Sequence, residues 1–331
     1  MFTKVRVAMN KDCQLKCIYC PHNKNILMEN YDNEDNYRLK DAEFLGIIKV
    51  MVDCGVTNVH FTGGEPTIKS NIAQIVKTVK SFGAAVELNT NGIGLTQGLT
   101  RELKGAGIEF LKISLDTPYS QDFFHITGGD CFDSVIIGIK NALQVMPVRL
   151  NCVVMRANQE SIIDLLRISN DLGVQQIHLL DLTYYPSCAD QKEFWEKEFV
   201  YLTKEVLPEI ENEFNCIFKV TDIFGCRFYQ AQLSPGGITA VLKEAQPTMR
   251  SPLCTSCPEY CHEGIFTLRL SCNGYLNFCP AKNSLGINAL KAWQEGNLTD
   301  ALRRYSEIFD SAIETNSFEK FLNVNQLNFR Q

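Results

Sequence analysis

The chain of 331 residues is long enough for two domains with ordinary cores, since 45% of its residues are hydrophobic and 21% are charged. Its net charge of −6, with both signs spread along the chain, argues against a nucleic acid polymer as partner, because phosphate binding needs concentrated Lys and Arg. No stretch approaches the roughly 20 apolar residues that span a bilayer, and residues 1–10 contain no long apolar run, so we expect a cytoplasmic protein without membrane contact.

Hydrophobic patterns up to residue 182 predict six strands that alternate with helices. The predicted strands are 5–9, 58–61, 84–89, 108–114, 148–155 and 175–182, and the predicted helices are 41–54, 71–82, 99–105, 132–144 and 159–171. Such βα units build a parallel sheet with right-handed crossovers. The sheet can curl toward a barrel, and we expect functional sites at the carboxyl ends of its strands.

The pattern changes after about residue 185. Residues 190–213 read as a longer amphipathic helix with an interior Pro208, two short strands flank Gly274, and residues 286–312 are again helical. The chain is cysteine-dense from Cys254 onward. We therefore predict two domains, residues 1–225 and residues 226–331.

Three cysteines directly after the first predicted strand carry the strongest signal. Cys13, Cys17 and Cys20 have the spacing C-x3-C-x2-C, with Tyr19 before the last. Clustered cysteines in a reducing compartment bind metal or do chemistry. Three thiolates can hold three irons of a 4Fe–4S cluster and leave the fourth iron open to S-adenosylmethionine, which one electron then cleaves to a 5′-deoxyadenosyl radical. Zinc with His22 as fourth ligand is the alternative, but zinc sites usually pair two knuckles.

Polar residues follow the next three predicted strands. They are the turn Thr62-Gly63-Gly64-Glu65-Pro66, the sequence Thr90-Asn91-Gly92 and the sequence Ser114-Leu115-Asp116. Glycines there let a ligand approach the backbone, Glu65 can accept a hydrogen bond from an ammonium group, and hydroxyls and amides suit a ribose. Ordinary turn and cap chemistry is the alternative. Arg149, near the start of the fifth strand, suits a carboxylate or ribose oxygen, or else a surface ion pair.

A second cysteine group lies near the end of the chain. Its four members are Cys254, Cys257, Cys261 and Cys279. Four thiolates in this arrangement satisfy either zinc or a second, auxiliary 4Fe–4S cluster. If one of the four does not ligate, an iron could face the active site and touch substrate. We expect the scattered cysteines elsewhere to be buried as small hydrophobic residues.

The cysteine triplet, the Gly63-Gly64-Glu65-Pro66 turn and Ser114-Leu115-Asp116 resemble the radical S-adenosylmethionine superfamily. The likeness is closer to the GTP 3′,8-cyclases of molybdenum-cofactor biosynthesis and their relatives, through residues 5–7, 124–128 and 148–154. This resemblance implies a partial (β/α)6, TIM-like barrel with a small C-terminal auxiliary-cluster domain of the twitch or SPASM type. It further implies that Cys13, Cys17 and Cys20 ligate the catalytic cluster. The S-adenosylmethionine contacts implied by it are Gly63, Gly64 and Glu65 at the methionine amino end, Thr90, Asn91 and Ser114 near the ribose, Tyr19 and Arg149.

The chain also departs from the cyclase pattern. Residues 325–331 have no paired glycines, His60 stands where the cyclases have a basic residue, and the second cysteine group has four members with longer spacing. Arg6 and Lys69 match basic residues of the cyclases. Arg6, His60 and Lys69 are therefore our candidates for substrate contact.

The sequence as a whole predicts a radical enzyme of specialised metabolism. We expect it to abstract hydrogen from a nucleotide-like or amino-acid-like small molecule and to receive electrons from a flavodoxin or ferredoxin. The alternatives are the GTP 3′,8-cyclase itself, a maturase of ribosomal peptides, and a non-enzymatic iron–sulfur or zinc carrier. A carrier would explain the cysteines but not the polar residues at the strand ends.

Overall fold

A computed structural model describes residues 3–20, 38–183, 189–223, 226–244, 268–277 and 286–310. The strands in these ranges form one 12-stranded sheet in the order β12-β11-β10-β1-β2-β3-β4-β5-β6-β9-β8-β7. Their bounds are β1 Lys4–Ala8, β2 Asn58–Thr62, β3 Ala85–Thr90, β4 Leu111–Ser114, β5 Val148–Val154, β6 Gln176–Asp181, β7 Lys219–Ile223, β8 Cys226–Gln232, β9 Thr239–Glu244, β10 Leu268–Leu270, β11 Tyr275–Asn277 and β12 Ile287–Asn288.

The middle of the sheet is parallel and follows the chain order from β1 to β6. β10 extends it in parallel beside β1, and β9 does so beside β6. The helices are α1 Asp41–Asp53, α2 Ile72–Ser81, α3 Gln97–Gly105, α4 Ser120–Thr127, α5 Phe132–Leu143, α6 Ile162–Asp171, α7 Ala189–Glu198, α8 Leu207–Phe214, α9 Ala289–Gln294 and α10 Leu298–Asp310. The predicted α/β class with a parallel, barrel-like sheet is confirmed.

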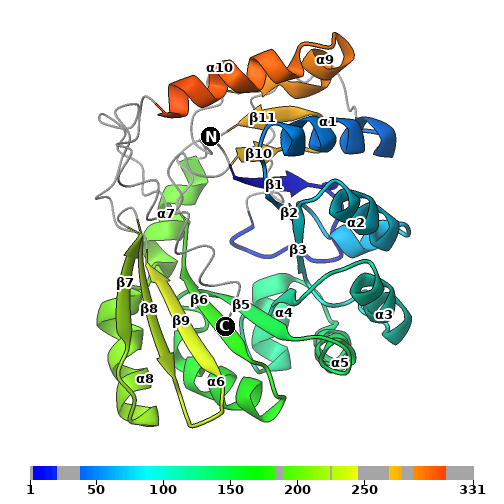
Figure 1. Ribbon diagram of the computed structural model, residues 1–331. Coiled ribbons are helices and arrows are strands. Elements are labelled where there is room, and N and C mark those ends of the chain that lie inside the picture. The colour runs from blue at the N-terminus through cyan, green and yellow to red at the C-terminus, as the bar shows by residue number, and fades with distance from the viewer. Residues whose placement is uncertain are drawn as a thin grey trace.

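The hydrophobic core lies between the sheet and the helices that cover its outer side. Figure 1 shows α1, α2, α3 and α5 along this side of the curved sheet. Every second residue of the parallel strands is buried there, for example Val5 and Val7 of β1, and packs with Ile47 and Ile48 of α1. The alternation of β1 and β5 is regular because successive side chains of a strand point to opposite faces. The residues in between therefore lie on the inner face.

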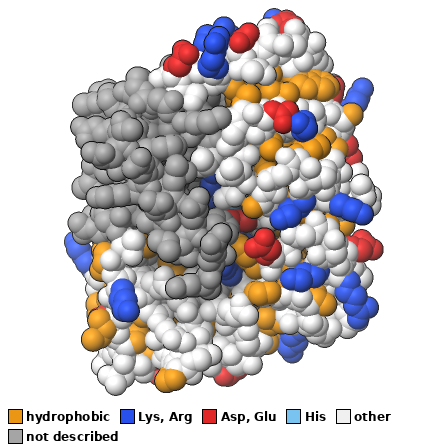
Figure 2. All heavy atoms as spheres, in the orientation of Figure 1, with side chains coloured by type: hydrophobic (Ala, Val, Ile, Leu, Met, Phe, Trp, Pro, Cys, Tyr) orange, Lys and Arg blue, Asp and Glu red, His pale blue; other side chains and the backbone are white. Residues whose placement is uncertain are grey.

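The inner face of the sheet is polar. Its side chains include Arg6, His60, Glu87, Lys112, Arg149 and His178, each of which alternates with core residues on its strand. Lys, Arg, Asp and Glu are mixed on the outer surface that Figure 2 shows. Cations are thus concentrated on the inner face but mixed with acids on that surface.

The structure differs from the predicted elements in several places. Helix α4 was not predicted, because its eight residues are too few for a clear period. The predicted helix 190–213 consists of α7, a π-helical turn Leu202–Val206 and α8, with Pro208 in the first turn of α8, where a missing N–H is tolerated. Gly296, with φ of 74°, separates α9 from α10.

The predicted domain boundary at residue 225 falls between β7 and β8, which pair with each other in an antiparallel hairpin. Strands on both sides of residue 225 belong to the same sheet, so the division into two domains is not marked by a break in the sheet and stays a prediction. None of the helices in the described ranges is long and apolar enough to cross a membrane.

Candidate functional site

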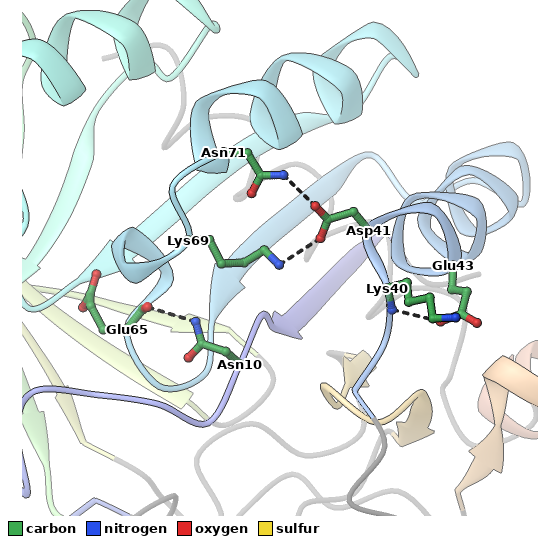
Figure 3. A network of polar contacts seen from close by, with 7 residues as sticks. All are labelled: Asn10, Lys40, Asp41, Glu43, Glu65, Lys69 and Asn71. Atoms are coloured by element: carbon green, nitrogen blue, oxygen red, sulfur yellow. Dashed lines mark hydrogen bonds and ion pairs between the residues drawn. The ribbon is translucent and has the colours of Figure 1, made fainter.

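The loop after β1, which carries the three cysteines, is bound to the turn after β2. The backbone N–H of Gly64 donates to the carbonyl of Asn10 (2.8 Å), and that of Glu65 donates to the carbonyl of Asp12 (2.7 Å). The Asn10 side chain donates in return to the carbonyl of Glu65 (3.0 Å), as Figure 3 shows. The Gly-Gly-Glu turn therefore fixes the path of the chain into Cys13.

The two glycines of this turn are needed for that close approach. Gly63 has φ of 116°, a conformation that favours glycine. A Cβ on Gly63 would lie 2.6 Å from the carbonyl oxygen of Asn10, and one on Gly64 would lie 2.1 Å from that of Asp12. In the structure, the absence of a side chain on these two glycines thus leaves room for the backbone of the cysteine loop. Their predicted contact with S-adenosylmethionine stays a prediction.

A second set of contacts holds the other half of the loop. The N–H groups of Lys16 and Ile18 donate to the carbonyls of Thr127 and Ile126 at the end of α4, at 2.8 and 2.9 Å. The Tyr19 hydroxyl donates to Asp116 Oδ2 (2.7 Å). The cysteine loop is therefore held from β2 on one side and from α4 and the end of β4 on the other.

The side chains of the three cysteines differ in exposure. Cys13 is exposed, whereas Cys17 and Cys20 are half-buried. Burial raises the pKa of the Cys13 thiol and, more strongly, that of Cys17, whose pKa is raised further by Asp116 and by the other two cysteines. These three groups are thus near enough to repel one another as thiolates.

This loop fits a 4Fe–4S cluster in its donor chemistry. A cubane binds each cysteine through a different iron, so the sulfurs need not converge on one point. In the described ranges, no three His, Cys, Asp or Glu side chains are arranged to hold a single metal ion. Iron charge on the sulfurs would favour the thiolates that burial disfavours in the free loop.

Glu65 is buried, and its carboxylate is taken up by four hydrogen bonds. Oε1 accepts from the N–H of Thr67 (3.0 Å), the Thr67 hydroxyl (2.7 Å) and the Thr90 hydroxyl (2.6 Å). Oε2 accepts from the N–H of Asn91 (2.6 Å). Glu65 therefore joins the ends of β2 and β3. Its predicted bond to an ammonium group would have to be added to these four.

The residues predicted near the ribose lie at adjacent strand ends, as expected for a parallel sheet. Asn91 reaches the cysteine loop, since its Nδ2 donates to Gln14 Oε1 (3.0 Å) and lies 3.7 Å from Cys13 Sγ. Ser114 pairs with Asn151 in the ladder between β4 and β5. Their contacts with a ribose stay predictions.

Asp116 is a site residue that the prediction did not include. It is buried, its Oδ2 accepts from Tyr19, and its Oδ1 accepts from the N–H of Val153 (2.8 Å). Burial raises its pKa to about 6. The signal was present in the sequence, because Asp116 belongs to the Ser-Leu-Asp motif at the end of a strand, but only the structure shows that Asp116 contacts Tyr19.

Pairs of cations lie directly opposite each other on the inner face. Lys112 of β4 is opposite Arg149 of β5, and Arg6 of β1 is opposite Arg269 of β10. Like charges in such cross-strand positions are destabilising. The Arg149 guanidinium also lies 3.8 Å from the centroid of the Phe110 ring. The sheet thus brings cations side by side on its inner face.

One carboxylate, Glu87 of β3, lies among these cations. It forms a very short contact with the ammonium group of Lys112, and its Oε2 lies 2.9 Å from His60 Nε2. Burial alone would raise the pKa of Glu87, but Lys112 and His60 outweigh it and hold the pKa well below the usual value. Burial also lowers the pKa of His60 well below its usual value, with help from Lys4. Glu87 is therefore ionised beside a neutral His60.

The pKa of His178 of β6 is also affected by the cations of the inner face. Burial, together with the positive charges of Lys112, Arg149 and Lys243, lowers the pKa of His178 to about 3. At pH values between about 3 and 6.5, which is the usual pKa of histidine, the side chain of residue 178 binds a proton in the unfolded chain but not in the folded chain. Stability should therefore fall as the pH falls through this window.

We expect His178→Gln to weaken this pH dependence. The melting temperature of the wild-type protein should fall between pH 7 and pH 5, and that of His178→Gln should fall less, because glutamine takes up no proton. Thermal unfolding under anaerobic conditions at the two pH values measures the difference. An equal fall in both proteins would show that His178 is not kept neutral in the folded state.

Lys69 and the second cysteine group complete the predicted site residues. Lys69 points toward Asp41 at the start of α1, with Nζ 2.8 Å from Oδ1, and Asn71 donates to the same carboxylate (Figure 3). Its role in substrate contact stays a prediction. The four cysteines Cys254, Cys257, Cys261 and Cys279 lie outside the described residues, so the auxiliary cluster also stays a prediction.

Comparison with known proteins gives consistent matches. The profile of a family described as "Radical SAM superfamily" matches residues 7–168. A protein of Saccharolobus islandicus named "Probable GTP 3',8-cyclase" is 32% identical over 289 residues, which cover 86% of this chain and 85% of that protein. A protein of Pyrococcus abyssi with the same name is 30% identical over 311 residues, covering 91% of this chain and 94% of its own.

Solved structures share the fold at lower sequence identity. Streptococcus suis SuiB bound to S-adenosylmethionine has a TM-score of 0.60 at 18% identity, over 92% of this chain and 68% of SuiB. The protein anSMEcpe with bound AdoMet has a TM-score of 0.58 at 12% identity, over 89% of this chain and 79% of its own. At these identities the likeness establishes the fold alone.

Proposed function

Because this chain belongs to the radical SAM superfamily, we propose that it cleaves S-adenosylmethionine beside Cys13, Cys17 and Cys20 and directs the radical at an anionic small molecule on the inner face of the sheet. Cys13, Cys17 and Cys20 would hold a 4Fe–4S cluster, which would supply the electron for reductive cleavage of S-adenosylmethionine to methionine and a 5′-deoxyadenosyl radical. The protein's own part is to hold the cluster and both ligands in reacting positions.

The described residues supply that rigidity. The Gly63-Gly64-Glu65 turn and the end of α4 hold the cysteine loop through backbone hydrogen bonds. Tyr19, beside Cys20, is fixed by its bond to buried Asp116. Asn91 reaches from the end of β3 to Gln14 in the same loop. A ligand at the carboxyl ends of β1 to β4 would therefore meet groups whose positions are set by buried bonds.

The observation that carries the substrate class is the pair of opposed cations Lys112 and Arg149. A sheet gains nothing in stability from two like charges side by side. An anionic ligand would repay that cost, since hydrogen bonds between a guanidinium or ammonium group and a phosphate or carboxylate are among the strongest in proteins.

GTP is the candidate that we favour within this class. Its triphosphate matches the positive inner face, and relatives named probable GTP 3′,8-cyclase align with this chain over 85% or more of their length. The reaction proposed is therefore 3′,8-cyclisation of GTP. Other nucleotides and amino-acid-like metabolites of specialised metabolism, and a ribosomal peptide, are the alternatives.

An anaerobic assay separates these possibilities. Reconstituted protein is reduced with dithionite, given S-adenosylmethionine, and analysed for 5′-deoxyadenosine with GTP, with ATP and with neither. We expect 5′-deoxyadenosine in all three and GTP consumption in the first. Formation of 5′-deoxyadenosine without loss of GTP would reject the cyclase activity. If no 5′-deoxyadenosine forms under any of the three conditions, the non-enzymatic carrier is the remaining hypothesis.

The remaining expectations concern what surrounds the reaction. A second 4Fe–4S cluster at Cys254, Cys257, Cys261 and Cys279 would bring the protein to about eight irons, which the same preparation measures. A flavodoxin or ferredoxin as electron donor and a cytoplasmic location stay predictions.

A further inference from the structure

Glu87 stands out because it is a buried carboxylate beside cations on its face of the sheet. It is 4% exposed and contacts Lys112 and His60. Arg149 lies directly opposite Lys112 in the ladder, and Lys243 is on the same face beyond His178. In the described ranges, neither Arg149 nor Lys243 has a carboxylate within ion-pair distance. Glu87 thus forms an ion pair with Lys112, whereas Arg149 and Lys243 have no such pair among the described residues.

This arrangement has a consequence for any bound anion. A carboxylate buried beside the anion site repels the ligand, and it does so strongly because little water screens the interaction. Repulsion grows with the charge of the ligand, so it falls more heavily on a triphosphate than on a monophosphate. The same carboxylate also holds the ammonium group of Lys112 in place and so hinders this group from turning toward a ligand.

We propose that Glu87 is a specificity-determining residue that sets how much positive charge the inner face offers and thereby selects anions by their charge. The inference rests on the proposed anionic substrate of this face. It assigns Glu87 no part in hydrogen abstraction. Since Glu87 and Lys112 cancel each other, their single substitutions should act on anion affinity in opposite directions.

The test measures binding to the cluster-loaded, full-length protein by calorimetry, with inorganic tripolyphosphate and orthophosphate as probes. Glu87→Gln keeps the shape and should bind tripolyphosphate at least about tenfold more tightly, with a smaller gain for orthophosphate. Lys112→Met should bind tripolyphosphate at least about tenfold more weakly. The double variant, which removes both charges, should return close to wild type. Glu109→Gln is the control, because it makes the same change in net charge at an exposed position. It should leave the affinities for both anions unchanged.

The outcomes distinguish this inference from the function on which it rests. If the wild type binds tripolyphosphate and Glu87→Gln binds it equally or less well, Glu87 does not limit the charge, although the anion site stands. If neither protein binds it, both the anion site and the role of Glu87 are rejected. A fall in affinity for both single variants would indicate a structural role, and melting temperatures identify any variant that fails to fold.

Discussion

Gly64→Ala should cost the protein its first cluster and lower the rate of 5′-deoxyadenosine formation by about 100-fold or more. The new Cβ would lie 2.1 Å from the carbonyl oxygen of Asp12, a distance at which something must move. That neighbour is backbone, and it lies one residue before Cys13. The displacement therefore reaches the cysteines, and a misplacement of about 1 Å is enough for such a loss. Iron content and the product assay measure the two effects.

Gly105→Ala is the matched control. Gly105 ends α3, and a Cβ there would meet nothing within 4 Å. Alanine also has the better helix propensity, by up to about 1 kcal/mol. This variant should keep its iron and its activity. Full activity in Gly64→Ala would mean that the turn does not determine the position of the cysteine loop.

Arg149→Met should raise the substrate concentration for half-maximal turnover about 10- to 100-fold, because a hydrogen bond to a charged group contributes about 1.5–3 kcal/mol. Methionine can still pack on Phe110, as the guanidinium does at 3.8 Å. The change therefore removes charge with little loss of packing. The rate of GTP consumption as a function of GTP concentration measures the effect, at two salt concentrations.

Arg101→Met, at an exposed position of α3, controls for the loss of one cation from the surface. It should leave the half-saturating concentration unchanged. The family resemblance implies that Arg149 contacts S-adenosylmethionine, and the same experiment separates the two roles. A variant whose requirement for S-adenosylmethionine rises, while that for GTP does not, would assign Arg149 to the cofactor and contradict its place in the anion site.

The sequence predicted the parallel sheet because its strands and helices have clear periods. The helices over 41–54, 71–82 and 132–144 and the strand over 148–155 agree with α1, α2, α5 and β5 to within a residue or two. The three strands β7, β8 and β9, which pair in antiparallel fashion, were not predicted. The break between α7 and α8 was not predicted either. There the hydrophobic period is weak, and the strands are formed only by pairing with β6 and with each other.

The cysteine loop was predictable, but the bonds that hold it were not. Motif spacing identified Cys13, Cys17 and Cys20, whereas the contact between Tyr19 and Asp116 joins residues 97 positions apart. The group of Glu87, His60 and Lys112 comes from three strands, and each member alone is an ordinary polar residue in an alternating strand. Sequence patterns reveal which face such residues share, not which of them meet.

The claim on which the rest depends is that S-adenosylmethionine binds directly at the cluster of the first cysteine loop. Electron paramagnetic resonance of the dithionite-reduced, anaerobic protein, recorded with and without S-adenosylmethionine, tests it most directly. We expect part of the iron–sulfur signal to change when S-adenosylmethionine is added, and this change should be lost in Cys17→Ser. An identical spectrum in both conditions, or zinc in place of iron at this loop, would contradict the account.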